Sequence, residues 1–314
     1  MKLVTFTLGG SEPAPGIWLD GGEVLNIPEA LVLDDSLSSD ATPDMRRAFG
    51  SLQTLIAAGE LAHDLLKRLN SHASSAGLAS ARVPQSAVTL LAPIPRPHKN
   101  IFCVGRNYVD HVKEGYTAQG LEIKLPEHIQ LFSKPPTTVI GPEGNIRYDS
   151  TLTQKLDYEV ELGVVLGKTG RDIAADSAYE HIFGYTVIND ISARDLQRRH
   201  DQWFKGKGLD TSCPMGPWIV TKDEIADPQD LAISLKVNGE TRQQARTSQM
   251  IFNLRRILMD LSRGLTLEAG DIIATGTPSG VGYAMDPPRL LAAGDVIECE
   301  IEHIGKLVNR VIAV

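Results

Sequence analysis

Two glutamates stand two positions apart at the start of an apolar run in KLDYEVELGVVLGK, residues 155–168. In an extended chain alternate side chains leave the same face, so Glu159 and Glu161 would share one face, with their backbones roughly 7 Å apart. Asp190 ends a later apolar run, YTVIND. If the fold brings the three carboxylates together, they form an all-oxygen site for a hard cation such as Mg²⁺, Mn²⁺ or Ca²⁺. For the glutamate pair taken alone, a solvated strand end is the simpler explanation.

The stretch CVGRNYVDHVKEG, residues 103–115, holds a second pair of residues that could do chemistry. His111 and Glu114 are three positions apart, so on a helical turn they lie within contact of each other. A carboxylate beside an imidazole orients the ring and supports its protonated form, which suits a general base that acts on water. The alternative is an ordinary first turn of a helix, capped by Asp110, with both side chains in solvent.

A glycine-rich loop, GTPSGVG at 276–282, and a single cysteine are weaker candidates. The backbone N–H groups of the loop and the Thr277 hydroxyl could hold an anionic group, although no Lys-Ser or Lys-Thr follows as it does in a P-loop. A simple tight turn is the plainer explanation. Cys213 precedes a proline and has no obvious base near it in the sequence, so a buried thiol is favoured over a nucleophile.

Charge and composition exclude several classes of function. The net charge of −8 disfavours nucleic acids and anionic membranes as partners. The three widely spaced cysteines argue against a disulfide framework. No run reaches the roughly 20 apolar residues of a transmembrane helix, and the first residues turn polar too soon for a secretory signal, so we expect a cytoplasmic protein. Basic residues nevertheless gather in one segment, which could be a solvated helix face or could serve a function. They are Arg194, Arg198, Arg199, His200, Lys205 and Lys207.

The hydrophobic pattern predicts a fold that is mostly β with some helix (α+β). Residues 1–95 are predicted to form a small N-terminal domain, with strands in 1–8 and 16–27 and helical spacing over 42–73. The remainder, 96–314, is dominated by short strand patterns, with a hairpin at Asn238-Gly239. Helices are expected around 178–181 and over 248–263, and the sheet is expected to be closed or rolled. Six apolar positions of the N-terminal helical stretch are expected to point inward: Leu52, Leu55, Ile56, Leu65, Leu66 and Leu69.

From about residue 97 to the C-terminus the sequence resembles the fumarylacetoacetate hydrolase family. Six stretches match in the order of the family: CVGRNYVDHVKE, LFSKPPTTVIGP, LDYEVELGVVLG, GYTVINDISARDLQ, KGLDTSCPMGPWIV and GDIIATGTPSGVG. The resemblance implies a mixed β-sandwich roll that assembles as a homodimer. It also makes residues 1–95 similar to the variable α/β domain that precedes the catalytic domain in many bacterial members.

The resemblance implies a metal site, with Glu159, Glu161 and Asp190 as the ligands of Mg²⁺ or Mn²⁺ and Ca²⁺ as a further option. Some members have a fourth carboxylate ligand upstream; this sequence has no clear counterpart, so water is expected to complete the coordination. The other matched positions are catalytic or bind the carboxylate and oxo groups of the substrate. The catalytic ones are the pair His111 and Glu114, in a lid at 110–127, and Lys207, which stabilises negative charge; the binding ones are Arg106, Arg194, Gln197 and Thr277.

On this basis we predict a metal-dependent hydrolase that cleaves a carbon–carbon bond in a 2,4-dioxo acid. The substrate would be a small anionic 2-oxo acid of the acylpyruvate or fumarylpyruvate type, as formed in aromatic compound catabolism, and the reaction would pass through a metal-stabilised enolate. The alternative in the same family is a decarboxylase or isomerase of 2-oxo or 2-hydroxydienoate diacids, including oxaloacetate, because these reactions share that enolate. A non-catalytic binding protein is disfavoured, because every candidate residue is present.

Overall fold

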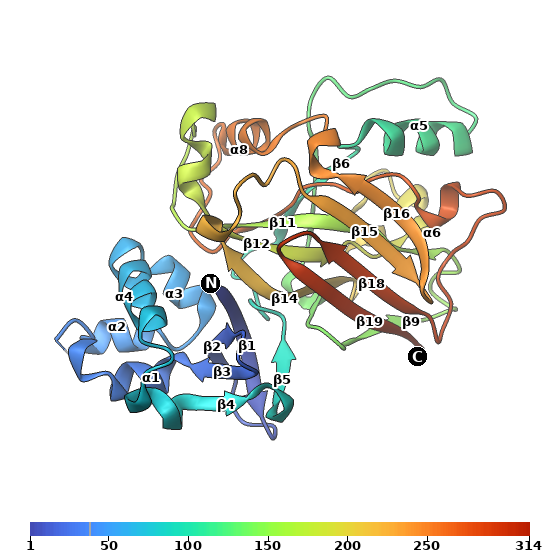
Figure 1. Ribbon diagram of the computed structural model, residues 1–314. Helices are drawn as coiled ribbons and strands as arrows, with labels where there is room; N and C mark the ends of the chain where they lie inside the picture. Colours follow the sequence, from blue (N-terminus) through green and yellow to red (C-terminus); the bar gives the residue numbers. More distant parts are fainter. Residues whose placement is uncertain (38) are drawn as a thin grey trace.

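Short strands follow one another along most of the chain, and helices are grouped at the N-terminal end and around the rim of the larger part (Figure 1). The computed structural model describes residues 1–37 and 39–314. The first part contains β1 (Lys2–Leu8), β2 (Ala14–Leu19), β3 (Glu23–Asn26), α1 (Ile27–Leu33), α2 (Pro43–Ala48), α3 (Leu52–Ala57), α4 (Glu60–Ser71), β4 (Arg82–Pro84) and β5 (Val88–Leu91). The remainder contains β6 (Ile101–Gly105), α5 (Val109–Ala118), β7 (Gln130–Lys134), β8 (Val139–Ile140), β9 (Asn145–Tyr148), β10 (Leu156–Asp157), β11 (Val160–Leu166), β12 (Ile182–Asn189), β13 (Ser192–Ala193), α6 (Arg194–Arg199), α7 (Phe204–Lys207), β14 (Cys213–Thr221), β15 (Ala232–Val237), β16 (Glu240–Arg246), α8 (Leu254–Ser262), β17 (Ile272–Ala274), β18 (Val296–Ile301) and β19 (Gly305–Ala313).

A twelve-stranded mixed sheet passes through both parts of the chain. Its main path is β4-β3-β2-β1-β14-β12-β11-β17-β6-β7, with β5 beside β1 and β8 beside β14. The N-terminal strands join the others through β1, where Lys2 and Leu3 pair antiparallel with Val220 and Ile219 of β14. The sheet is therefore continuous across the division expected near residue 96. The placement of a domain boundary there stays a prediction.

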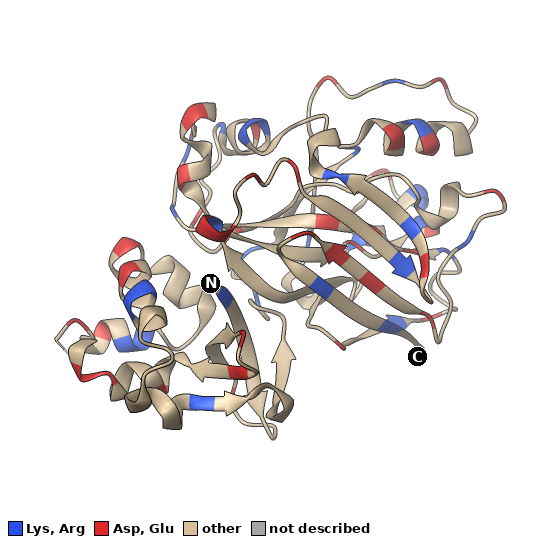
Figure 2. Ribbon diagram, viewed as in Figure 1, with Lys and Arg blue, Asp and Glu red and all other residues tan. Residues whose placement is uncertain are grey.

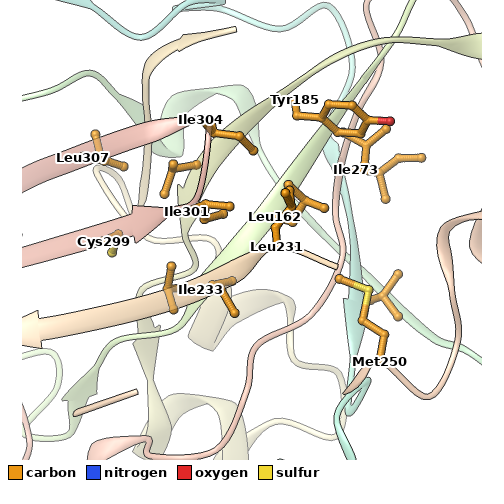
Figure 3. Packing of buried hydrophobic residues seen from close by; sticks show 14 of the residues in the cluster. Leu162, Tyr185, Leu231, Ile233, Met250, Ile273, Cys299, Ile301, Ile304 and Leu307 are labelled. Carbon is orange, nitrogen blue, oxygen red and sulfur yellow. The ribbon is translucent and has the colours of Figure 1, made fainter. Parts of the chain in front are cut away.

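A smaller sheet of five strands, ordered β16-β15-β18-β19-β9, packs on one face of β11 and β12. Figure 3 shows the core between them, where Leu162 of β11 lies near Ile233 of β15 and Ile301 of β18. Burial of these apolar side chains is the main favourable term in folding. Over the described residues both sheets are open, so the closed arrangement is wrong, whereas the mixed α+β class with packed sheets is confirmed.

The opposite face of β11 and β12 is covered by the N-terminal helices. Val165 and Ile188 belong to a buried cluster that also contains Leu55 of α3 and Leu66 of α4. All six positions predicted to point inward from this helical stretch are buried. Every residue of β11 is buried as a result, which agrees with its almost continuous apolar run.

The outer face of the smaller sheet carries charges of both signs side by side (Figure 2). Lys306 of β19 lies 3.1 Å from Glu298 of β18, so neighbouring strands pair these charges across the surface. Among the helices of residues 1–37 and 39–314, none is both long enough and apolar enough to span a bilayer.

Helix ends depart from the prediction where side-chain caps override the apolar pattern. α8 begins at Leu254 rather than 248, because the Asn253 side chain accepts a hydrogen bond of 2.9 Å from the N–H of Arg256. The segment predicted around 178–181 is a 3₁₀ helix, η5 (Ala175–His181). The hairpin is confirmed, since Asn238 and Gly239 both adopt positive φ. The hydrophobic pattern did not predict α6 and α7, which carry Arg194 and Lys207, although a helix face was one explanation of this basic segment.

Candidate active site

A cavity of about 480 Å³ opens between α5, the ends of β6 and β11, and the short helices α6 and α7. Most of the predicted site residues line it, namely His111, Lys207, Glu159, Glu161, Arg106, Arg194, Gln197 and Thr277. The other two, Glu114 and Asp190, lie behind this lining and contact His111 and Lys207 respectively. The fold therefore gathers residues from four separate stretches of the sequence at one place.

The three predicted ligand carboxylates converge where the start of β11 pairs with the end of β12. Each of Glu159, Glu161 and Asp190 offers an oxygen, and these oxygens all lie within 4.8 Å of one another. The backbone holds this arrangement, because the N–H of Asp190 donates to the carbonyl of Glu159 at 2.8 Å. The three residues are 5%, 1% and 0% exposed. The explanation of the glutamates as a solvated strand end is therefore wrong.

Two of the three carboxylates are neutralised by cations of the chain itself. The Lys207 ammonium donates to Glu159 at 2.7 Å and to Asp190 at 2.6 Å, and an Arg194 guanidinium nitrogen lies 2.7 Å from Glu159. Burial alone would raise the pKa of Glu159, but the charges of Lys207 and Arg194 outweigh burial and hold that pKa well below its usual range. Asp190 has a second counter-ion on its other oxygen, Lys134, at 2.8 Å. The basic segment 194–207 is thus partly buried here rather than wholly solvated.

Glu161 has no such counter-ion among the residues that the structure describes. Glu161 instead accepts a hydrogen bond from the backbone N–H of Gly276, at 2.8 Å from one carboxylate oxygen. Burial, followed by the negative charges of Asp190 and Glu159, raises the pKa of Glu161 well above its usual range. A divalent cation beside the three oxygens would remove this repulsion, and an all-carboxylate donor set suits a hard ion. The residues therefore fit a divalent metal.

The glycine-rich loop binds anionic groups, but these are carboxylates of the protein. The N–H of Gly276 donates to Glu161, that of Gly280 to Glu114 at 2.8 Å, and that of Gly282 to Asp157 at 2.8 Å. Gly280 has φ of +105°, and a Cβ there would lie 1.9 Å from the carbonyl oxygen of Arg242, so only glycine fits. The loop is more than a tight turn, since it fixes three carboxylates around the cavity.

His111 and Glu114 form a hydrogen-bonded pair on α5. Nδ1 of His111 lies 2.8 Å from one carboxylate oxygen of Glu114, whose other oxygen accepts the N–H of Gly280. Both side chains are largely buried, so the solvated first-turn explanation is wrong. Asp110 makes no cap, because the helix follows Tyr108 without a side-chain cap. The lid motion expected for residues 110–127 stays a prediction.

Two buried charged residues of the site were missed in the sequence. Asp157 accepts hydrogen bonds from Arg194 at 2.9 Å and from the backbone N–H groups of Gly282, the last residue of the glycine-rich loop, and of Tyr283, which follows it. It extends the alternation of Glu159 and Glu161 by one step, and that pattern could have identified it. Lys134, in LFSKPP, is fully buried, and its ammonium also donates to the carbonyl oxygens of Ile191 and Lys207. A single lysine in an apolar run gives no comparable signal.

Cys213 is buried near this site and remains a thiol. Burial raises its pKa to about 12, so very little thiolate exists at neutral pH. The sequence-based preference for a buried thiol over a nucleophile agrees with this environment.

Comparison with known proteins places these features in a family. Residues 100–312 match the family described as Fumarylacetoacetate (FAA) hydrolase C-terminal. The chain belongs to the fumarylacetoacetate hydrolase family. A solved fumarylacetoacetate hydrolase from the psychrophile Exiguobacterium antarcticum is 41% identical, covers 100% of both chains and has a TM-score of 0.78.

Two curated relatives correct the predicted reaction. The chain is 46% identical to the oxaloacetate tautomerase YisK of Bacillus subtilis, over 90% of this chain and 95% of the relative. It is 44% identical to the mitochondrial oxaloacetate tautomerase FAHD2A of Homo sapiens, over 73% of this chain and 71% of the relative. The prediction of a carbon–carbon bond hydrolase is therefore wrong. The error has a physical reason: hydrolysis and isomerisation of 2-oxo acids need the same kinds of residue, so these motifs do not separate them.

Lys134 provides a test of the charge balance in this site. Lys134→Met keeps the length of the side chain but leaves one Asp190 oxygen without its counter-ion, so we expect the free energy of unfolding to fall by about 3 kcal/mol or more. The measurement is urea denaturation followed by circular dichroism. Lys113→Met, which removes an exposed lysine 3.3 Å from Asp110, should change it by less than about 0.5 kcal/mol. Equal stability of the two variants would contradict the assigned role of Lys134.

Proposed function

We propose that this protein catalyses the keto–enol tautomerisation of oxaloacetate or of a closely similar 2-oxo acid. The observation that carries the proposal is that one cavity is lined both by buried carboxylates suited to a divalent cation and by a histidine bound to a carboxylate. The names of the relatives that are 44% and 46% identical support the same reaction. Tautomerisation moves one proton between carbon and oxygen and breaks no carbon–carbon bond, so it requires a proton carrier and stabilisation of negative charge on oxygen.

The metal would be held by Glu159, Glu161 and Asp190, and Mg²⁺ or Mn²⁺ is proposed because all three donors are carboxylates. When bound, such an ion supplies positive charge beside the oxo group of the substrate, which favours the enol form. Lys207 and Arg194 would then have two roles. They keep Glu159 ionised, and they offset the surplus negative charge of the buried carboxylates.

His111 is proposed as the proton carrier. A neutral imidazole that donates from Nδ1 to Glu114 leaves Nε2 with a lone pair, and His111 lines the cavity. In the keto-to-enol direction, this nitrogen takes a proton from C3, the released electron pair forms the C2–C3 double bond, and the π pair of the C2 carbonyl moves to its oxygen. The proton is then delivered to the C2 oxygen, so no proton is gained or lost overall. Glu114 acts as a positioning residue, because it fixes the ring and supports the transient imidazolium.

Arg194 is proposed to bind the carboxylate next to the oxo group. Two of its nitrogens are engaged by Asp157 and by Glu159, and Gln197 lies 3.2 Å from one of them. The third, Nη2, is buried and has no hydrogen-bond partner within residues 1–37 and 39–314. A buried donor without a partner costs free energy, so an anionic substrate oxygen at this position would be favourable.

His111→Asn tests the proton carrier. We expect the enzyme-catalysed rate of oxaloacetate tautomerisation to fall by about 10²- to 10⁴-fold, because asparagine cannot accept and return a proton. The measurement is the decay of the ultraviolet absorbance of the enol in the presence of Mg²⁺, corrected for the rate without protein.

The matched control is His303→Asn. His303 is exposed, and its φ of +61° is a conformation that asparagine tolerates well, so this variant should keep the wild-type rate. A His111 variant with the wild-type rate and an unchanged melting temperature would refute the role of His111.

Glu161→Gln tests the metal site without reference to activity. Mg²⁺ or Mn²⁺ should raise the melting temperature of the wild-type protein in a concentration-dependent way, because a ligand that binds only the folded state stabilises it. In Glu161→Gln the rise should be lost or need about tenfold more metal, because one anionic ligand is removed. Glu122→Gln, at an exposed position, should respond as the wild type does. An unchanged metal response in Glu161→Gln would contradict the proposed ligand set.

A further inference from the structure

Gln243 of β16 is a fully buried amide that packs against the glycine-rich loop, whereas Gln244 beside it is exposed. A register shift between β15 and β16 leaves Arg242 as an extra residue next to it, and a bulge of this kind redirects side chains. Gly280 of the loop packs directly on this bulge, because a Cβ there would lie 1.9 Å from the carbonyl oxygen of Arg242. The side chain of Gln243 is therefore held between the smaller sheet and the loop.

The hydrogen bonds of the Gln243 amide allow it only one orientation. Its Oε1 accepts the N–H of Val160 at 3.0 Å, and its Nε2 donates to the carbonyl oxygen of Pro278 at 2.8 Å. A backbone N–H can only donate, and a carbonyl oxygen can only accept. Exchanging the amide oxygen and nitrogen would set oxygen against oxygen and N–H against N–H, so the backbone partners assign the two atoms.

This orientation decides the role of the Thr277 hydroxyl. Nε2 of Gln243 also donates to Oγ1 of Thr277 at 2.8 Å, so the hydroxyl oxygen is the acceptor in this contact. A threonine hydroxyl has one proton of its own to donate as well. Within residues 1–37 and 39–314 this hydroxyl donates no hydrogen bond, and Thr277 lines the cavity. Its proton is therefore available to an oxygen that binds in the cavity.

The same amide holds Thr277 in place relative to the carboxylate cluster. Val160, whose N–H binds Gln243, is the residue between Glu159 and Glu161. Because Gln243 binds both β11 and the glycine-rich loop, the Thr277 hydroxyl keeps a fixed position beside these glutamates. A donor that is oriented before binding lowers the entropy cost of recognising a ligand.

We infer that Gln243 is a positioning residue that makes Thr277 a hydrogen-bond donor to an anionic oxygen in the cavity. The family resemblance implies only that Thr277 contacts substrate, whereas the direction of its hydrogen bond follows from the amide of Gln243. A donor suits a carboxylate or enolate oxygen, since both only accept. Gln243 is not among the described residues that line the cavity, so it acts through Thr277. Which substrate supplies the oxygen rests on the proposed function.

A ligand that is not turned over tests this inference. Oxalate is a planar dianion that resembles the enolate of a 2-oxo acid, and its affinity for the Mg²⁺-loaded protein can be measured by calorimetry. We expect Thr277→Val and Gln243→Glu each to weaken oxalate about tenfold, because one charge-assisted hydrogen bond is lost. In Gln243→Glu the ionised carboxylate accepts the Thr277 proton, which then no longer reaches the ligand. Gln243→Met adds no charge and should weaken oxalate at least about threefold, because the hydroxyl loses its fixed orientation.

The double variants separate action through Thr277 from a general structural effect. In the Thr277→Val background, neither Gln243 variant should change the affinity for oxalate by more than about twofold. The matched control is Gln244→Glu, at the exposed neighbouring position, which should bind oxalate as the wild type does.

Equal weakening by the Gln243 variants in both backgrounds would overturn the inference, because a merely structural role predicts it. Unchanged affinity in Gln243→Glu and Gln243→Met, or a wild-type protein that does not bind oxalate, would overturn it as well. If oxalate binding depends on Gln243 through Thr277 while oxaloacetate is not tautomerised, the proposed function fails and the role of Gln243 stands.

Discussion

Three carboxylates buried within 4.8 Å of one another repel each other strongly, and the architecture of the site depends on how that repulsion is offset. Lys207 and Arg194 neutralise Glu159, and Lys207 shares Asp190 with Lys134. Glu161 accepts a backbone N–H and has no counter-ion among residues 1–37 and 39–314, so burial, together with the negative charges of Asp190 and Glu159, raises its pKa. A divalent cation bound to the three carboxylates would complete this balance. The same arrangement explains why an acidic protein buries lysines and an arginine at its centre.

The rest of the fold keeps these charges in position. β11 and β12 are buried on both faces, by the smaller sheet on one side and by the N-terminal helices on the other, so the strand ends that carry the carboxylates are rigid. The glycine-rich loop adds backbone hydrogen bonds to Glu161, Glu114 and Asp157. It thereby connects the carboxylate cluster, the histidine pair and Asp157 beside Arg194, which are separate in the sequence. The cavity is thus lined by residues from segments that lie far apart in the sequence.

Much of this architecture was predictable, because it follows from local patterns. Alternation of side chains identified β11 and the shared face of Glu159 and Glu161, and the Asn-Gly pair identified the hairpin. The start of α8 was wrong by six positions because a side-chain cap at Asn253 decided it. Lys134 was missed because its role depends on Asp190, which lies far away in the sequence and close in the fold. The choice of hydrolase was wrong for another reason: the motif residues can serve either reaction. The homodimer and the cytoplasmic location stay predictions.

The central claim is that this site moves a proton at C3 of a 2-oxo acid and leaves the carbon skeleton intact. Proton NMR of oxaloacetate in D₂O with Mg²⁺, with and without the protein, follows both events at once. The account predicts that the protein accelerates the exchange of the C3 hydrogens for deuterium and adds no pyruvate beyond the protein-free reaction. Accelerated formation of pyruvate without accelerated exchange would contradict it.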